Sequence, residues 1–434
     1  MIELFYLSDM TLTTTPHPLQ QLISDRVLAE DLACEFGTPL YIYDADRLRD
    51  NTSRMENAFS GSFPKSQICY ALKANSNPHI LSVLLGAASS LGADCSSPGE
   101  LYIAQRLNIP PERCIYTGNY ESPEELKTAL DSGVHLNLDD SSSYLRLRKI
   151  SVPKEISFRL NPGFGKGRFP AIVTAGREAK FGIPREKIID AYRLAQDDGV
   201  ERFGLQCMTG SGNLDPGYFV ELLSAILTVA REIEESLGIT FEYISMGGGF
   251  GIPYKLDESS LDVSELFESL GKVFRKFYDR NSPDTPALFI EPGKYLVADA
   301  GFILSRVTGV KESYKRFVGL DAGMNTLIRP ALYNAYHRIL KIGEPEAPTT
   351  QTVDVTGGIC ENSDRLAVDR DLPTLNEGDL VAIMDAGAYG YVMATPYNTR
   401  SRPAEVLMEN GKPRMIRKKE TIEDIFAGCN WNGD

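Results

Sequence analysis

The chain has 434 residues, 42% of them hydrophobic and 24% charged, which is the composition of an ordinary globular protein. Its net charge of −14 argues against nucleic-acid binding, since that needs a basic surface. No apolar run approaches the roughly 20 residues that cross a bilayer, and the opening MIELFYLSDM lacks the basic and apolar stretches of a secretion signal. We therefore expect a cytoplasmic protein that does not bind membranes.

Eight short apolar runs, each followed by an amphipathic helical stretch, fill the first two thirds of the chain. They cover residues 67–73, 93–96, 114–118, 134–138, 155–161, 202–208, 241–246 and 287–291, and nearly every run ends in a residue suited to binding or chemistry. The runs are apolar almost throughout rather than alternating, which is typical of parallel strands buried on both faces. This order predicts an α/β fold with a (β/α)8 TIM-type barrel and an active site at the C-terminal ends of its strands.

The helical stretches between these runs have clear start and stop signals. Asp215 and Pro216 offer an N-cap and a first-turn proline, an apolar stripe follows, and Gly238 closes the helix. Similar stripes run over residues 78–91 and 184–198. The sequence therefore predicts helices at these three places.

The pattern changes after residue 291. Few helical stretches follow, and turns separate a series of short strand-like runs at 295–307, 316–320, 351–355, 380–384 and 403–409. We therefore predict a second, β-rich domain over residues 296–434, after a barrel over residues 46–295. Residues 1–45 precede the first barrel helix, and we expect them to contribute a strand to the β-rich domain.

The cysteines and histidines give no sign of a metal site or a redox pair. Seven cysteines form no CxxC motif, and four histidines form no HExxH motif. Four of the cysteines lie within the apolar runs or at their ends and are expected to be buried free thiols: Cys69, Cys95, Cys114 and Cys207. The sequence predicts no metal cofactor.

Lys73 ends the first apolar run, where its amine would project into the mouth of the barrel. A lysine at a strand end is most often a solvated charge. In a partly desolvated pocket, however, burial lowers the pKa of a lysine and makes it a nucleophile that forms a Schiff base. The residues at the ends of the last strands indicate what such a lysine would hold.

Three glycines, Gly247, Gly248 and Gly249, follow the seventh run and resemble a nest of backbone N–H groups for an anion. Ser211, with Gly210, could add donors to the same anion. A flexible turn is the alternative, whereas a nucleotide P-loop is excluded because no Gly-Lys-Ser/Thr follows. The nest suits a monophosphate on an organic cofactor.

Glu291 ends the eighth apolar run, where an unpaired carboxylate is costly. It needs a cationic partner, and a protonated pyridine nitrogen would serve. A lysine, a phosphate nest and such a carboxylate together describe a site for pyridoxal 5′-phosphate.

Nine sequence motifs occur in order along essentially the whole chain: YALKAN, GADCSSPGEL, TGN, KFGI, MGGGFGIPY, EPGK, DAGMNTLIRPALY, CEN and DAGAYGYVM. Together they resemble the alanine-racemase-type pyridoxal-phosphate-dependent decarboxylases, and among these the diaminopimelate decarboxylases. The resemblance implies a barrel with a β-rich domain, pyridoxal 5′-phosphate as the cofactor and decarboxylation of an amino acid.

The resemblance assigns many of these residues to a cofactor site. It implies that Lys73 binds the cofactor covalently, that Glu291 pairs with the pyridine nitrogen, and that the glycine turn holds the phosphate with Ser211 and Tyr389. The full set that it places around the cofactor is Lys73, Asp94, Met208, Ser211, Gly247, Gly248, Gly249, Glu291, Lys294 and Tyr389.

The resemblance also implies a homodimer with shared active sites. Lys73 and Cys360 would be the catalytic residues, with Cys360 donated across the interface to protonate the substrate Cα after carbon dioxide leaves; a buried thiol is the alternative for Cys360. Arg329 and Tyr333 would hold a distal carboxylate and Glu361 a distal ammonium, or the three could form a surface ion-pair cluster. The residues placed around the small amino-acid substrate are Lys294, Arg329, Tyr333, Glu361 and Tyr389.

Two positions depart from the family pattern. Met208 stands where the family typically has a histidine that packs on the cofactor ring, and Lys294 stands where it typically has an arginine. The favoured activity is decarboxylation of meso-diaminopimelate to L-lysine. The departures keep open another substrate, such as D-lysine, D-ornithine or an intermediate of a specialised pathway. A regulatory homologue is a third alternative, against which the intact Lys73 and Cys360 speak.

Overall fold

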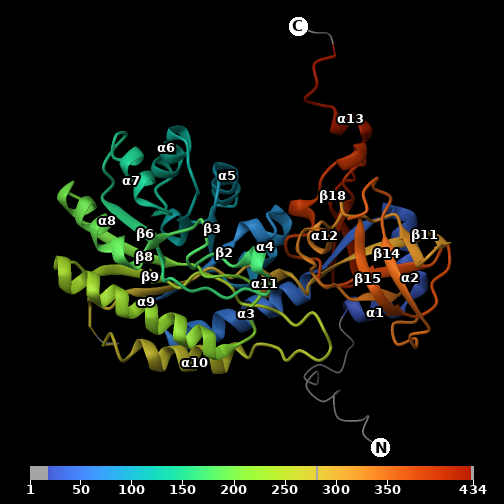
Figure 1. Cartoon of the computed structure of the whole chain (residues 1–434), viewed down its shortest axis with the longest axis horizontal. Coiled ribbons are helices and arrows are strands. Elements are labelled where there is room, and N and C mark those ends of the chain that lie inside the picture. The colour runs from blue at the N-terminus through green and yellow to red at the C-terminus, as the bar shows by residue number, and fades with distance from the viewer. Residues whose placement is uncertain (1–17, 280–281, 432–434) are drawn as a thin grey trace, which may run out of the picture.

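The computed structural model describes residues 18–279 and 282–431, which form two sheets (Figure 1). The first is a closed barrel of eight parallel strands, in which β10 pairs with both β9 and β2, and the short β7 lies beside β6. The predicted barrel is confirmed, and each of its eight strands falls within one residue of a predicted run. The eight barrel strands are β2 (Ser66–Ala71), β3 (Gly92–Cys95), β4 (Cys114–Tyr116), β5 (His135–Leu138), β6 (Glu155–Asn161), β8 (Arg202–Cys207), β9 (Phe241–Ser245) and β10 (Ala287–Ile290), and the additional strand is β7 (Ile183–Pro184).

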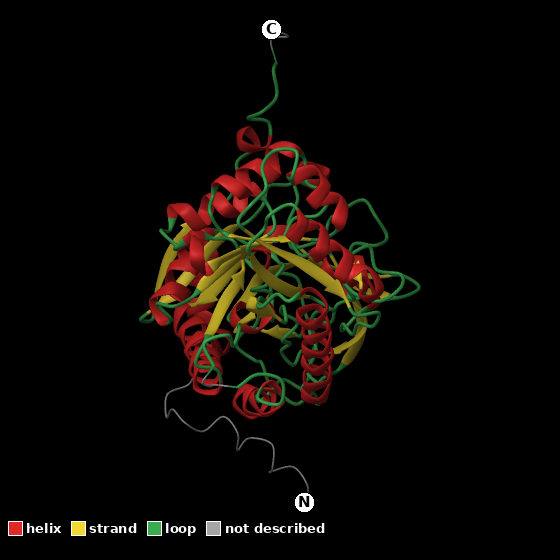
Figure 2. Cartoon of the chain, turned by 90° about the vertical axis from the view of Figure 1, so that its left-hand side faces the viewer, coloured by secondary structure: helices red, strands yellow, loops and turns green. Residues whose placement is uncertain are grey.

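Helices lie around the outside of the barrel strands (Figure 2). The helix predicted between Asp215 and Gly238 is confirmed at both ends as α9 (Pro216–Leu237). The Asp215 side chain accepts a hydrogen bond from the N–H of Gly217 at 3.0 Å, and Gly238 ends the helix with φ of +66°. The helix predicted over 78–91 ends earlier, at Ala87, because the chain turns before β3. The barrel helices are α3 (Ala45–Ser62), α4 (Pro78–Ala87), α5 (Pro98–Arg106), α6 (Pro123–Asp131), α7 (Ser141–Leu147), α8 (Arg185–Asp197), α9 (Pro216–Leu237) and α10 (Val263–Phe274).

The second sheet is mixed and confirms the predicted β-rich part of the fold. Its main order is β15-β14-β12-β11-β1-β17-β18, and β16 pairs with β11 and β13. Strand β1, from the N-terminal part of the chain, pairs antiparallel with β11 and parallel with β17. The domain boundaries after residues 45 and 295 stay predictions. The strands are β1 (Leu40–Asp44), β11 (Gly301–Glu312), β12 (Arg316–Leu320), β13 (Ile339–Lys341), β14 (Gln351–Thr356), β15 (Arg365–Leu372), β16 (Leu380–Ile383), β17 (Ala404–Glu409) and β18 (Lys412–Arg417).

The strand predicted over 295–307 is wrong at its start. Residues Lys294–Val297 form the helical turn α11, and the strand begins only at Gly301, because the chain turns between the barrel and the second sheet. Strands β13, β15 and β18 were not predicted; most side chains of β18 are exposed, so it has no apolar run. The remaining helices are α1 (Pro18–Ser24), α2 (Arg26–Phe36), α12 (Arg329–Tyr333) and α13 (Ile422–Ile425), with single 3-10 turns at Leu72–Ala74, Pro111–Arg113, Pro170–Ile172, Tyr391–Met393 and Tyr397–Thr399.

Hydrogen bonds join the loop after β16 of the second sheet to the turn that carries Lys73. The side-chain amide of Asn75 donates to the carbonyl oxygen of Gly387 at 3.1 Å, and the backbone N–H of Tyr389 donates to the carbonyl oxygen of Ala74 at 2.7 Å. The mouth of the barrel is therefore fixed against the β-rich domain at Lys73.

The structure bears on the sequence predictions about buried thiols, membrane-spanning helices and metal sites. The four cysteines predicted to be buried free thiols are buried and unpaired, whereas Cys34, Cys360 and Cys429 are exposed. Among the described residues, no helix is long and apolar enough to cross a membrane, and no group of three His, Cys, Asp or Glu side chains could hold a metal ion. The opening segment considered as a secretion signal lies outside the described residues.

Candidate active site

Lys73 and Asp94 meet at the C-terminal ends of two neighbouring barrel strands. Lys73 lies in a helical turn directly after β2, and Asp94 lies in β3, opposite Ala71 of β2 in parallel register. The Lys73 ammonium donates a short hydrogen bond to Oδ2 of Asp94, whose side chain is 1% exposed against 41% for Lys73. The barrel therefore places a lysine of its mouth against a buried carboxylate.

The charge balance around Lys73 differs from the prediction. Burial lowers the pKa of Lys73, but the Asp94 carboxylate, followed by Tyr389 and Glu291, raises this pKa by more, so the net shift is upward. The predicted net lowering is wrong because the strand register brings Asp94 against the amine. Lys73 is therefore an ammonium ion at neutral pH, and it must lose a proton before it can act as a nucleophile.

Glu291 is a buried carboxylate held by two polar side chains of neighbouring strands. Its Oε1 accepts a hydrogen bond from the Ser245 hydroxyl at 2.6 Å, and its Oε2 accepts one from the Gln206 amide at 2.9 Å. Burial, together with the nearby Asp94 carboxylate, raises the pKa of Glu291 to about 7, against the lowering effect of Lys73. A carboxylate in this position is stabilised by a cationic group beside it.

Three glycines follow β9 in a turn that leaves no room for side chains. Gly247 and Gly249 have φ of +69° and +98°, and a Cβ on Gly248 would lie 2.2 Å from the carbonyl oxygen of Glu291. The N–H of Gly248 donates to the Met208 sulfur at 3.2 Å. Because a thioether is a weak acceptor, a stronger anionic acceptor could take this N–H. Met208 thus packs on the glycine turn.

Lys294 is a buried cation at the start of α11. Its ammonium donates to the Ser211 hydroxyl at 3.1 Å and lies 5.6 Å from the centre of the Tyr389 ring, and it forms no ion pair with a carboxylate of the described chain. Burial, followed by the positive charges of Arg329 and Arg168, lowers the pKa of Lys294 to about 7. An anion bound beside Ser211 would restore the charge on Lys294.

Arg329 is also buried without an acidic partner among the residues that the structure describes. It is 0% exposed, its Nε donates to the Tyr333 hydroxyl at 2.9 Å, and its Nη1 lies 3.2 Å from Nε2 of His337. Its guanidinium carbon lies 5.2 Å from the centre of the Tyr254 ring, and its Nη2 has no hydrogen-bond partner. A surface ion-pair cluster is therefore the wrong interpretation for Arg329.

Cys360 and Glu361 lie on an exposed loop of the β-rich domain, so the alternative of a buried thiol is wrong for Cys360. The backbone N–H of Cys360 donates to Oδ1 of Asn398 at 2.9 Å. Glu361 accepts hydrogen bonds from the Tyr397 hydroxyl and, at 3.0 Å, from the Ser363 hydroxyl. These bonds stay within the β-rich domain, and none of them reaches the barrel mouth.

Three residues of the site were missed from the sequence. Gln206 and Ser245 are polar side chains inside otherwise apolar barrel strands, and this placement could have identified them, because a buried polar group needs a partner. His337 gave no comparable signal. It lies outside any regular run, and its importance comes from its contact with Arg329.

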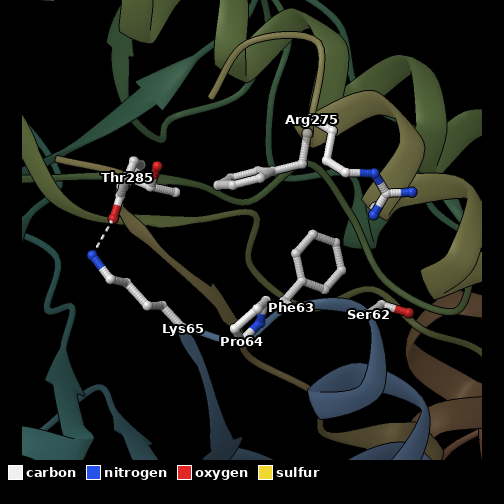
Figure 3. Close-up of a pocket in the computed structure, with 9 residues that line it drawn as sticks. Ser62, Phe63, Pro64, Lys65, Arg275 and Thr285 are labelled. Atoms are coloured by element: carbon white, nitrogen blue, oxygen red, sulfur yellow. Dashed lines mark hydrogen bonds between the residues drawn. The ribbon is translucent and has the colours of Figure 1, made fainter. Parts of the chain in front are cut away.

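A small pocket lies at the other end of the barrel (Figure 3). Phe63 and Lys65 precede β2, Thr285 precedes β10, and Lys65 donates to the carbonyl oxygen of Thr285 at 2.9 Å, so the pocket is at the N-terminal ends of the strands. Its volume of about 20 Å³ holds roughly one water molecule. The pocket is therefore too small for an amino-acid substrate.

The comparisons with known proteins cover most of the chain. The family model described as "Pyridoxal-dependent decarboxylase, pyridoxal binding domain" matches residues 47–298. The chain is 43% identical over 403 residues to the diaminopimelate decarboxylase of Methanothermobacter thermautotrophicus, covering 93% of this chain and 94% of that one. It is 35% identical to Protein TabA of Pseudomonas amygdali pv. tabaci, covering 95% of this chain and 97% of that one.

A solved structure shares the fold over most of the chain. The diaminopimelate decarboxylase of Helicobacter pylori, complexed with L-lysine, superposes with a TM-score of 0.83 at 34% identity. The match covers 92% of this chain and 98% of that one. The fold and the family resemblance predicted from the sequence are thereby confirmed.

Proposed function

Because the chain belongs to the family of pyridoxal-dependent decarboxylases, we propose that it removes carbon dioxide from meso-diaminopimelate to form L-lysine. The observation that supports this substrate is that Arg329 is fully buried and that its Nη2 has no hydrogen-bond partner. An unsatisfied buried donor costs about 1–3 kcal/mol, and more when charged. The second carboxylate of diaminopimelate would satisfy this donor, whereas lysine and ornithine have no such group.

The residues around Lys73 fit pyridoxal 5′-phosphate. Oδ1 of the buried Asp94 has no hydrogen-bond partner, and the buried Glu291 forms no ion pair with a described residue. In the glycine turn, the N–H of Gly248 is bound to the weakly accepting sulfur of Met208, which a phosphate oxygen could replace. When bound, the cofactor withdraws electron density from the substrate Cα. We assign the covalent link to Lys73, the ring nitrogen to Glu291, ring contacts to Asp94 and Met208, and the phosphate to Ser211, Gly247, Gly248, Gly249, Lys294 and Tyr389.

The chain's own side chains would control the protons of the reaction. Asp94 accepts a hydrogen bond from the Lys73 ammonium and so holds it at the mouth of the barrel. Ser245 and Gln206 hold Glu291 in one orientation, so that it can keep a proton on a neighbouring nitrogen. We assign the proton that returns to the substrate Cα to Cys360.

We further propose a homodimer with shared active sites. Cys360 and Glu361 are exposed, and their hydrogen bonds lie within the β-rich domain. A second copy could therefore receive this loop at its own barrel mouth, where Glu361 would bind the distal ammonium of the substrate. Tyr333 would share the distal carboxylate with Arg329. The cytoplasmic location stays a prediction.

A second candidate is decarboxylation of another amino acid, which Lys294 favours. One ammonium replaces the planar fork of an arginine at this position, and it lies within reach of Ser211. A regulatory homologue has no specific observation in its favour, because the Lys73–Asp94 pair and the buried Glu291 are intact.

Carbon dioxide release from a panel of amino acids tests the proposal. The holoenzyme would be assayed with meso-diaminopimelate, and with both stereoisomers of lysine and of ornithine, and products would be separated by chromatography. We expect L-lysine from meso-diaminopimelate, at a kcat/KM at least tenfold above the other substrates. Preference for a monocarboxylic diamino acid would support the second candidate instead. No release from any substrate by cofactor-loaded protein would support a regulatory homologue.

A further inference from the structure

We infer that His337 is a positioning residue of the substrate site: as a neutral imidazole it accepts a hydrogen bond from Arg329 and so directs the free Nη2 of Arg329 toward the distal carboxylate of the substrate. Nη1 of Arg329 lies 3.2 Å from Nε2 of His337, and both side chains are 0% exposed. The inference rests on the proposed function, in which Arg329 binds that carboxylate.

The hydrogen-bond partners of His337 fix its tautomer. Nδ1 lies 2.7 Å from the carbonyl oxygen of Met384, which can only accept, so Nδ1 carries the hydrogen. A guanidinium can only donate, so Nε2 must offer its lone pair to Arg329. Both contacts are satisfied by the neutral Nδ1–H tautomer and by no other form of the ring.

The backbone around His337 is held in place on both sides. The N–H of Met384 donates to the carbonyl oxygen of Arg338 at 2.9 Å, and Arg370 donates to the carbonyl oxygen of His337 at 2.8 Å. Asn334, with φ of +57°, reverses the chain after α12 and returns it toward Arg329. The imidazole is therefore a fixed support against which the guanidinium can be aligned.

Charge explains why a neutral acceptor suits this position. Burial, followed by the positive charges of Arg329, Arg370 and Lys294, lowers the pKa of His337 well below its ordinary value, so the ring stays neutral. A carboxylate here would neutralise Arg329 before the substrate arrived. The imidazole and the Tyr333 hydroxyl satisfy two donors of Arg329 without removing its charge, and Nη2 remains for the substrate.

Three substitutions at one position test this role. His337→Gln keeps a neutral acceptor, His337→Leu removes it, and His337→Glu adds a charge. We expect His337→Leu to raise KM for meso-diaminopimelate about tenfold to a hundredfold with little change in kcat, in line with the loss of a charge-assisted hydrogen bond. His337→Glu should be at least as damaging, and His337→Gln should stay within about threefold of wild type.

The controls separate a positioning role from damage to the fold. Each variant should keep the wild-type absorption of the bound cofactor and the wild-type circular dichroism, so that a change in KM cannot come from loss of cofactor or of fold. A folded His337→Leu holoenzyme with wild-type KM, or a His337→Gln variant as impaired as His337→Leu, overturns the inference. If the wild type itself does not prefer meso-diaminopimelate, the proposed function fails instead.

A measurement on the unmodified holoenzyme covers the case in which the variants do not fold. The chain has four histidines, so nitrogen-15 labelling of histidine gives few ring signals. Substitution of His17, His79 and His135 one at a time identifies their signals, and the remaining signal belongs to His337. We expect a neutral ring with hydrogen on Nδ1 at pH 7. A ring protonated on Nε2, or on both nitrogens, contradicts the inference.

Discussion

The hydroxyl of Ser245 lies 2.6 Å from Oε1 of Glu291, on the strand next to the one that leads to Glu291. A hydrogen bond to a charged group contributes about 1.5–3 kcal/mol, so we expect Ser245→Ala to lower kcat on the order of tenfold and to shift the absorption of the bound cofactor. Ser157→Ala is the matched control, because this buried strand serine donates to Asn137 at 2.8 Å instead. Equal effects of both substitutions would assign the loss to the barrel core.

Lys294 makes anion binding depend on pH. Its pKa is lowered to about 7, below the usual value of about 10.4. A lowered pKa means that the cost of charging Lys294 is fully present below pH 7 and is relieved as pH rises above 7. An anion offsets that cost by pairing with the charged form, so sulfate should raise the melting temperature of cofactor-free protein more at pH 6.5 than at pH 8.5.

Two variants at this position check the cause. Lys294→Arg stays charged across the range, so the sulfate effect should be the same at both pH values. Lys294→Met should lose most of the rise in melting temperature that sulfate causes. If the pH dependence persists in both variants, it comes from another group.

Lys73 should be the single attachment point of the cofactor. Borohydride treatment of the holoenzyme should fix one pyridoxyl group on the peptide that contains Lys73, as seen by mass spectrometry. Lys73→Ala should have no measurable turnover while keeping its fold by circular dichroism. A pyridoxyl group on another lysine would move the site elsewhere.

The exposed loop of Cys360 leads to a subunit-mixing prediction. Neither Lys73→Ala nor Cys360→Ala homodimers should be active, but a mixed dimer would contain one complete site. When the two variants are mixed and allowed to exchange subunits, half of the dimers should be mixed, and each mixed dimer has one of its two sites intact. The mixture should therefore recover up to about a quarter of wild-type activity. Exchange without recovery would show that both residues act within one chain.

The barrel was predictable because its strands are continuous apolar runs, and their ends supplied Lys73 and Glu291. The contact between Lys73 and Asp94 was not predictable, because it depends on the register of two parallel strands. This contact raises the pKa of Lys73, whereas the sequence led us to expect a lowered pKa. Strand β18 could not be predicted from an apolar run, because most of its side chains are exposed to water. His337 was missed for another reason: its role depends on which ring nitrogen carries the hydrogen, and the sequence does not record that.

The substrate preference of Arg329→Gln tests the central claim most directly. The ratio of kcat/KM for meso-diaminopimelate to that for D-lysine, which lacks the distal carboxylate, would be measured in wild type, in Arg329→Gln and in Arg306→Gln. Arg306 is the control, because its guanidinium pairs with Glu30 at 2.7 Å in the β-rich domain. We predict that Arg329→Gln lowers this ratio tenfold to a hundredfold, matching the loss of about 1.5–3 kcal/mol, while cofactor absorption is retained. An unchanged ratio in cofactor-loaded Arg329→Gln would contradict the assignment of Arg329 to a distal carboxylate.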